Sequence, residues 1–484
     1  MSTTPLAPLT PSASFNLRAV RGALGDSFDL VIRELTVAGT KAYALCFDGL
    51  CDELRLTEAV LRPLTDASLK KPSGSLAEEI AERLYQGTDC RILRTVSEAC
   101  QAALGGCLVL LPEGEAAGLS FPLQGFPKRA VDRPQSEQNE KGGQEAFTDN
   151  FKDNTALLRR RLRTPDLRLE LLTLGDTSRT PVALCFLRGR ADEAMLEQVR
   201  RRLQNARLDT ALGAGYLRPF LEGKRPSLFR GTGVTERPDT LAAMLAEGRV
   251  GVIVDGSPYA IVAPWLFSDH FHTADDYLSG PLYATFMRAL RVVCAVIATA
   301  LPGCFVAVCL FHPEIIPADI MFDIAEAESK TPFPLMTEAL VIHLIYEAVR
   351  EAGLRMPVAV GHAVSIVGAL VIGETAVRAG LIGAPMLIVV ALTAVCSSVA
   401  VRLHEPVSLI RFAMILAGGL AGLYGLMLLA GLLLTDLCAV APFGVPYSAP
   451  VSPFVRAAQR DTVWRAGWRK LGRRVLTVKE MKFE

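Results

Sequence analysis

Apolar and polar residues are unevenly distributed along this chain. Residues 1–283 carry charged side chains at the frequency of a soluble protein, with short apolar runs between them. Residues 357–436 contain no lysine, and long apolar stretches separate their charged side chains, which are Glu374, Arg378, Arg402, Glu405, Arg411 and Asp436. This pattern predicts an α/β soluble N-terminal region followed by an α-helical multi-span membrane domain over residues 284–436.

The soluble region is predicted to contain two α/β subdomains, residues 16–125 and 151–283, after a flexible N-terminus of residues 1–15. Short apolar runs bounded by turn residues alternate with helix-like patterns, which is typical of mixed α/β structure. Residues 126–150 have few apolar side chains and several prolines and glycines, which indicates a linker. We expect strands at 42–47, 107–111, 167–174, 181–187, 250–254 and 259–262, and helices at 76–85, 154–163, 191–203 and 240–247.

The apolar stretches of the second half predict about four membrane spans, at 292–311, 357–379, 381–401 and 409–434. The first has no charge and is long enough to cross a bilayer at about 1.5 Å per residue. Arg288 and Arg291 precede it, and Glu314 follows it, so the excess of positive charge places the soluble subdomains on the cytoplasmic side.

Four spans return the chain to the cytoplasmic side. Residues 437–484 are therefore predicted to form a basic cytoplasmic tail, with Trp464 and Trp468 at the lipid headgroups. The same topology places Arg402 and Arg411 on the outer side, against the usual charge bias.

The second span carries a strip of small residues, since Gly361, Ser365, Ala369 and Gly373 recur at every fourth position. In a membrane such a strip permits close helix packing, and it can also line a pore. Glu374 follows directly, and a carboxylate in a span usually faces a partner or a wet cavity. Arg378, one turn later, is the local partner; without that pair, Glu374 would form an acidic ring that favours cations in an oligomer.

An amphipathic helix is predicted at residues 335–352, which either lies in the membrane interface, the placement we prefer, or packs against the spans as a fifth membrane element. Its charged residues fall mostly on one arc, while its one acid on the apolar side lies in the first turn, where the helix dipole stabilises negative charge. We expect this region to transmit a partner's movement to the spans. The expected coupling residues are Glu338, Glu347, Arg350, Arg355 and Arg378.

Little else in the sequence predicts chemistry. The formal net charge of +1 gives no support to nucleic-acid binding, and the eleven cysteines form no metal-ligand spacing. No nucleotide-binding, nucleophile-elbow or zinc-protease motif is present, so no catalytic residue, metal or cofactor is predicted. The arginine run at 159–163 is expected to form a solvated helix face or an interdomain contact, and Asp255 a hairpin turn. His270 and His272 are expected on one side of a strand, without further metal ligands.

Several segments resemble, in collinear order, the A subunits of spore germinant receptors, the GerA family. They include LGDSFDLVIREL, DNTALLRRRLRTPDL, TERPDTLAAMLAEGRVGVIVDGSPYAIVAP, HPEIIP, TPFPLMTEALVIHLIYEAVREAGLRMPVAVGHAVSIVGALVIGETAVRAG and FGVPYSAP. The resemblance covers about residues 24–453. It implies a multi-pass protein of the spore inner membrane, with its N-terminal domains on the core or cytoplasmic side, that responds to nutrients. It also implies a homo-oligomeric channel that releases monovalent cations and acts with a permease-like B subunit and a lipoprotein C subunit.

Two segments depart from the family pattern. KGGQEAFTDNFKDN stands where the family has a segment containing Gly-Pro-Arg, and residues 227–231 replace the usual Leu-Phe-Pro-Gln. Either change is compatible with the SpoVAF-like branch or with a diverged receptor subunit. The hypotheses that compete are an oligomeric cation-release channel subunit, a non-conducting signal-coupling subunit of the SpoVAF type and a secondary transporter. The third lacks the inverted repeats of transporters, and an enzyme lacks any catalytic constellation.

Overall fold

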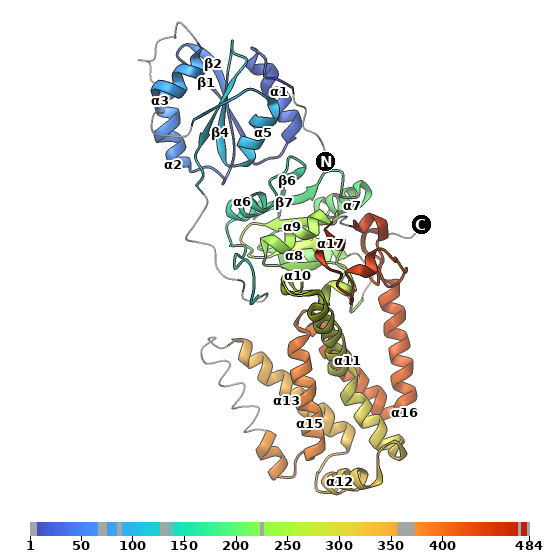
Figure 1. The fold of residues 1–484 in the computed structure, drawn as a ribbon. Coiled ribbons are helices and arrows are strands. Elements are labelled where there is room, and N and C mark those ends of the chain that lie inside the picture. The colour runs from blue at the N-terminus through green and yellow to red at the C-terminus, as the bar shows by residue number, and fades with distance from the viewer. Residues whose placement is uncertain are drawn as a thin grey trace.

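The computed structural model describes residues 7–65, 75–84, 90–125, 134, 137, 139–222, 227–355, 373–472 and 476–481. These residues form two α/β subdomains and a bundle of helices, which follow one another from top to bottom in Figure 1. The C-terminal residues return to the second subdomain. The predicted α/β region is confirmed, and its expected strands and helices are present within a few residues of their predicted ends.

The first subdomain is an antiparallel sheet with helices on both faces. Its strands β1 (Leu30–Val37), β2 (Thr40–Phe47), β3 (Arg91–Leu93), β4 (Cys107–Pro112) and β5 (Gly118–Pro122) lie in the order β1-β2-β4-β5-β3. One face packs on α1 (Ala13–Leu24) and α5 (Val96–Leu104). The other packs on η1 (Leu56–Leu61), α3 (Arg62–Thr65), α4 (Leu76–Glu79) and η2 (Ile80–Leu84), while α2 (Glu53–Arg55) before them is exposed. Along β2, Leu45 and Phe47 face the first set and Ala44 and Cys46 the second, so both sides of the strand are apolar.

The second subdomain repeats this topology. Its strands β6 (Leu167–Leu174), β7 (Thr180–Leu187), β8 (Gly233–Thr235), β9 (Val250–Val254) and β10 (Ala260–Ala263) lie in the order β6-β7-β9-β10-β8, which is the order of the first sheet. Helices α6 (Phe151–Arg161) and α9 (Pro238–Ala246) cover one face, and α7 (Glu193–Gln204) and α8 (Ala214–Glu222) the other. The antiparallel register of β9 and β10 confirms the predicted hairpin, and Asp255 in its turn accepts a hydrogen bond from the amide of Phe151.

A buried asparagine marks the repeat. Asn16 in α1 and Asn154 in α6 are each 1% exposed. The Nδ2 of Asn16 donates to the carbonyl of Thr10 at 2.7 Å, and its Oδ1 accepts from the amide of Thr10 at 2.8 Å. Asn154 makes the same two bonds with Thr148, at 2.6 and 2.7 Å. Each pair is six residues apart, a spacing that is visible in the sequence but that we did not use to predict a repeat.

The two subdomains meet at a buried ion pair. Arg159 of α6 is 1% exposed, and its guanidinium contacts both carboxylate oxygens of Asp29 at 3.0 Å. It also donates to Ser27 and lies 4.4 Å from the ring centroid of Phe47. Of the two alternatives for the arginine run, Arg159 therefore makes the interdomain contact.

The described part of the helical region contains two helices that are long and apolar enough to cross a membrane, α11 (Pro281–Phe311) and α16 (His404–Ala439). Between them lie α12 (Ala318–Ser329), which we did not predict, α13 (Leu335–Arg355) and α15 (Ala384–Val399), which is a shorter apolar helix. Most of the predicted span at 357–379 lies outside the described residues.

Helix α16 is bent and differs from the single span predicted at 409–434. Its backbone is non-helical at Ala421 and at Gly422, where φ is +58°. Near its start Glu405 pairs with Arg230 at 2.9 Å, and near its end Asp436 accepts from Ser227 at 2.7 Å. A straight helix would place Glu405 and Asp436 roughly 46 Å apart, whereas residues 227 and 230 are about 11 Å apart at most. The helix therefore consists of two arms, and the second returns to the second subdomain (Figure 1).

The 3-10 helix η5 (Val401–Leu403), just before α16, corrects the predicted position of Arg402. Its guanidinium pairs with Glu137 at 2.6 Å and donates to the carbonyls of Asp269 and His272 in the second subdomain. Arg402 consequently lies on the side of the soluble subdomains and not on the opposite side. With Arg402 on this side, its position agrees with the predicted excess of positive charge on the side of the soluble subdomains.

The C-terminal residues pack on the second subdomain. Phe443 belongs to the core beneath α7 and α8, and Val445 and Val478 pack against Leu266. Trp468 is exposed, but its Nε1 donates to the carbonyl of Tyr277 at 2.8 Å. The tail thus covers the subdomain, which the basic sequence did not predict.

The two histidines suggested as a strand pair lie elsewhere. Residues around His270 form the 3-10 helix η3 (Phe267–Phe271). The Nε2 of His270 lies 2.8 Å from the hydroxyl of Tyr447, and the Nε2 of His272 lies 2.8 Å from the carbonyl of Thr462. Each imidazole therefore bonds to the tail.

We expect Arg159→Ala to destabilise the contact between the subdomains by about 3–5 kcal/mol, because Asp29 would stay buried without its cation. Arg161→Ala is the matched control, since Arg161 is partly exposed and pairs with Glu145, and should cost about 1 kcal/mol or less. Hydrogen exchange of the β1 and α6 amides in the full-length protein measures both. Equal protection in the wild type and Arg159→Ala would contradict the role of the pair.

The two-arm form of α16 predicts that both its ends are reached from one side of the membrane. In vesicles that expose the soluble subdomains, an impermeant maleimide should label Cys438, which is exposed in the second arm. It should also label a cysteine introduced by Glu405→Cys in a Cys438→Ser background; Cys438→Ser alone gives the background signal. Labelling of one position from each side would mean that α16 crosses as a single span.

Candidate functional site

The described helices enclose a group of charged and polar side chains that we call the charged cluster. It consists of Glu347 and Arg350 of α13, Ser397 of α15, and His404, Ser408 and Arg411 of α16. Arg411 is 0% exposed. Its Nε donates to the carbonyl of Ala298 in α11 at 2.8 Å, and its terminal nitrogens lie 3.3 Å from Glu347 and 3.3 Å from Ser397. One guanidinium of α16 therefore contacts three other helices.

Glu347 is the acceptor at the centre of the charged cluster. Its Oε1 accepts from Ser408 at 2.8 Å, and its Oε2 accepts from Arg350 at 2.9 Å. The Nε2 of His404 lies 3.6 Å from Oε2. A guanidinium removed from water is costly unless it is hydrogen-bonded and paired, so these contacts fix how α13 and α16 approach each other.

Helical spacing explains why these residues meet. His343, Glu347 and Arg350 lie at positions i, i+4 and i+7 of α13, and His404, Ser408 and Arg411 have the same spacing in α16. Residues at these intervals share one face of a helix. Two polar faces thus pack together inside otherwise apolar helices. The pattern His-x3-Glu-x2-Arg and His-x3-Ser-x2-Arg is the signal in the sequence by which Arg411, His404 and Ser408 could have been identified.

A second charged group joins α11 to the soluble part. Arg288, 0% exposed, donates to Asp276 of α10 (Ala274–Leu278) at 3.1 Å and to Asp461 of the tail at 2.8 Å. Arg291 donates to the same carboxylate of Asp276 at 2.8 Å. Burial alone would raise the pKa of Asp276, but the hydrogen bonds from Arg291 and from the amide of Thr273 hold it below its usual range. The base of α11 is therefore tied to α10 and to the tail by a permanently charged carboxylate.

The predicted small-residue strip is described only at its end. Gly361, Ser365 and Ala369 lie outside the described residues. Gly373 is buried, and a Cβ there would meet Leu387 of α15 at 3.2 Å. Glu374 accepts from Arg378 at 2.6 Å, and both side chains are more than half exposed on this single chain.

The remaining coupling residues lie apart from the charged cluster. Arg355 pairs with Glu351 on the exposed side of α13, at 2.6 Å. Glu338 is 1% exposed, and its Oε1 accepts from the amide of Gly383 at 2.8 Å, at the start of α15. Of the five predicted coupling residues, the structure brings Glu347 and Arg350 together.

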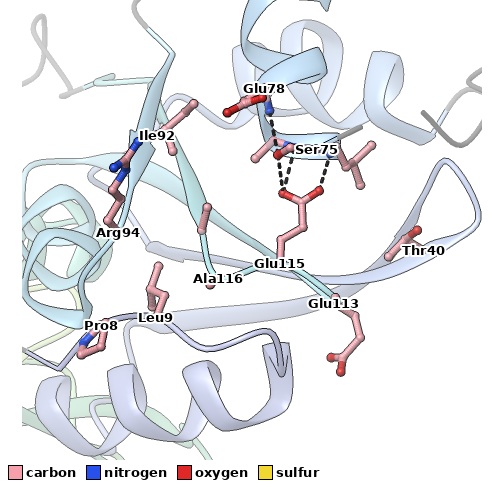
Figure 2. Close-up of a pocket in the computed structure, with 14 residues that line it drawn as sticks. Pro8, Leu9, Thr40, Ser75, Glu78, Ile92, Arg94, Glu113, Glu115 and Ala116 are labelled. Carbon is pink, nitrogen blue, oxygen red and sulfur yellow. Dashed lines mark hydrogen bonds between the residues drawn. The ribbon is translucent and has the colours of Figure 1, made fainter. Parts of the chain in front are cut away.

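A cavity of about 790 Å³ lies in the first subdomain. Figure 2 shows Glu115 directed from its wall to Ser75, whose hydroxyl donates to that carboxylate at 2.9 Å. The amides of Leu76 and Ala77 also donate to Glu115, so this carboxylate caps α4. Because the carboxylate of Glu115 already accepts these hydrogen bonds, this cavity is a weaker candidate for a functional site than the charged cluster.

Comparison with known proteins shows the family of the chain. The model of the Bacillus/Clostridium GerA spore germination protein family matches residues 18–476. Spore germination protein KA of Bacillus subtilis is 34% identical over 466 residues, which is 95% of this chain and 85% of that protein. The uncharacterized membrane protein YfkQ of the same organism is 32% identical over 96% of this chain and 91% of its own length.

Two further comparisons extend the same set. Spore germination protein B1 of Bacillus subtilis is 30% identical over 93% of this chain and 94% of that protein. The crystal structure of the N-terminal domain of the A subunit of the Bacillus megaterium spore germinant receptor GerK3 is 27% identical, covers 54% of this chain and 98% of that one, and has a TM-score of 0.43. With a family match over nearly its whole length, the chain belongs to the GerA family of spore germination proteins.

Proposed function

We propose that this chain is a membrane subunit of a spore germinant receptor and takes part in nutrient-triggered germination, as an oligomeric subunit of a cation-release channel. The germination role is supported by relatives that are named as spore germination proteins over nearly the whole length of the chain. The proposed location is the spore inner membrane, with the soluble subdomains on the core side. The proposed partners are further copies of the chain, a permease-like B subunit, a lipoprotein C subunit, membrane lipid and monovalent cations.

The observation that carries the coupling part of this proposal is the contact of Arg411 with three other helices. A displacement of α13 or α15 would break or shift hydrogen bonds of this guanidinium, and Arg411 also holds the carbonyl of Ala298 in α11. Ten residues before Ala298, Arg288 of the same helix is tied to α10 and the tail. Helix α11 therefore connects the charged cluster to the contacts of Arg288 with α10 and the tail, and a rigid element held at both ends is one means of carrying coupling between sites.

The proposal of a cation channel depends on Glu374, which follows the predicted strip of small residues. Its carboxylate and Arg378 are exposed on one copy of the chain, so both are available to a neighbouring copy. A ring of such carboxylates would favour cations. The alternative is a non-conducting signal-coupling subunit of the SpoVAF type, and it is favoured by the size of the soluble region and by the pairing of Glu374 within its own helix.

We expect Arg411→Met to slow the nutrient response of spores by about five- to a hundredfold, because the helices lose their common partner. Arg62→Met is the matched control: this exposed arginine of the first subdomain pairs locally, with Glu58, in the contacts described for it, and the response should be unchanged. Optical density loss after addition of a nutrient mixture measures the rate, and immunoblotting measures protein level. A normal rate in Arg411→Met would remove the charged cluster from the coupling path.

We expect Glu374→Gln to reduce the preference for potassium over chloride in planar-bilayer recordings of the purified oligomer, because an acidic ring would lose its charge. Glu351→Gln, which changes an exposed acid of α13, is the control. Unchanged conductance and selectivity would exclude Glu374 from an ion pathway. Purified protein that never oligomerises and passes no ions would favour the signal-coupling alternative.

A further inference from the structure

Two carboxyl groups meet at the end of the bundle that is farther from the soluble subdomains. Glu328 lies near the end of α12 and Glu338 in the first turn of α13. Both approach Gly383, which precedes the first residue of α15. The amide of Gly383 donates to Glu338 Oε1 at 2.8 Å, and a Cβ on this glycine would stand 2.9 Å from Glu328 Oε1 and 3.6 Å from Glu338 Oε1. The two acids of different helices therefore share one small space.

Each carboxyl keeps a buried oxygen without a hydrogen-bond partner among the described residues. These atoms are Oε2 of Glu338 and Oε1 of Glu328. Glu338 as a whole is only 1% exposed. No lysine or arginine of the described chain forms an ion pair with either acid. Lys330, two residues from Glu328, is exposed and pairs with Glu326 at 2.8 Å. The site therefore has an excess of negative charge and vacant acceptor atoms.

The other groups that face this pair are neutral. The hydroxyl of Thr331 donates to the backbone carbonyl of Glu328 and also interacts with the carboxyl of Glu338. Cys309 of α11 lies within electrostatic range of Glu328. The amide of Gly383, at the start of α15, is the third neutral group. The start of a helix stabilises one negative charge, but the carboxylates of buried Glu338 and partly buried Glu328 repel each other, which favours the neutral form of one of them. Burial and the nearby Glu338 accordingly raise the pKa of Glu328 to about 7.

Glu338 also lines a cavity beside the pair. A cavity of about 400 Å³ is lined by this residue and by the apolar side chains of Phe333, Val341, Ile345 and Ile382. Glu338 is the one charged residue among the described residues that line this cavity, so it is the group that would bind a small cation there.

We propose that Glu328 and Glu338 form a binding site for one small cation, either a shared proton or a monovalent metal ion, which joins α12 and α13 to the start of α15. A positive charge between the two carboxyls satisfies both vacant oxygens and removes their repulsion. The site is distinct from the charged cluster, and it does not depend on the proposed function.

The test is the thermal stability of the full-length protein in nanodiscs, measured in choline buffers from about pH 5 to about pH 8 and again with about 150 mM potassium. In choline the Tm of the wild type should fall by several degrees as pH rises, because the raised pKa of Glu328 means that the proton is lost and both carboxyls become charged in the folded state. Glu328→Gln should lose this decline, since an amide supplies the hydrogen bond at every pH. Glu326→Gln, on the exposed side of α12, is the matched control and should keep it.

The potassium series separates the two cations. A Tm at about pH 8 that potassium restores in the wild type but not in Glu328→Gln assigns a metal ion, and a decline that potassium leaves unchanged assigns the shared proton. If Glu328→Gln does not fold, Glu338→Gln, which keeps an oxygen for the amide of Gly383, must show the same loss of pH and potassium dependence. The same decline in the wild type and in these variants, or no decline in the wild type under either condition, overturns the proposal.

Discussion

Guanidinium groups without access to water determine how the parts of this protein are joined. Arg159 holds the first subdomain to the second, Arg288 holds α11 to α10 and the tail, and Arg411 holds α16 to three other helices. Each is at most 1% exposed, and each finds partners on elements far apart in the sequence. A buried guanidinium leaves a large penalty when a partner is missing, so each junction permits one arrangement and disfavours small displacements from it.

These junctions follow one another along the molecule. The charged cluster is connected through α11 to the pair of Arg288 and Asp276, and the second subdomain is connected to the first through Arg159. Apolar packing between helices tolerates sliding, because dispersion contacts are not directional. Hydrogen-bonded arginines do not tolerate it, because their five donors have a fixed planar geometry. A change at one end of the chain of contacts is therefore resisted or transmitted at the next, which is the property that a signalling subunit needs.

The soluble fold could be predicted from the sequence because strands such as β6 and β9 are short apolar runs bounded by turn residues, a local signal. The repeat and the bend of α16 could not. Asn16 and Asn154 look like ordinary polar residues until their buried bonds to threonine are known. Gly422 lies among other glycines that pack closely, and hydropathy does not reveal which of them adopts a positive φ. Arg411 was seen only as an irregularity of charge, because its partners come from three other helices.

The bend at Gly422 also bears on the order in which the chain is completed during synthesis. The second arm of α16 must turn back before Phe443 can enter the core beneath α7 and α8. The ribosome releases that phenylalanine long after the strands of this core, and after both long apolar helices. The second subdomain therefore acquires this core residue only in chains whose helical region has been synthesised in full. Chains truncated within the bundle would present an incomplete core to cellular proteases.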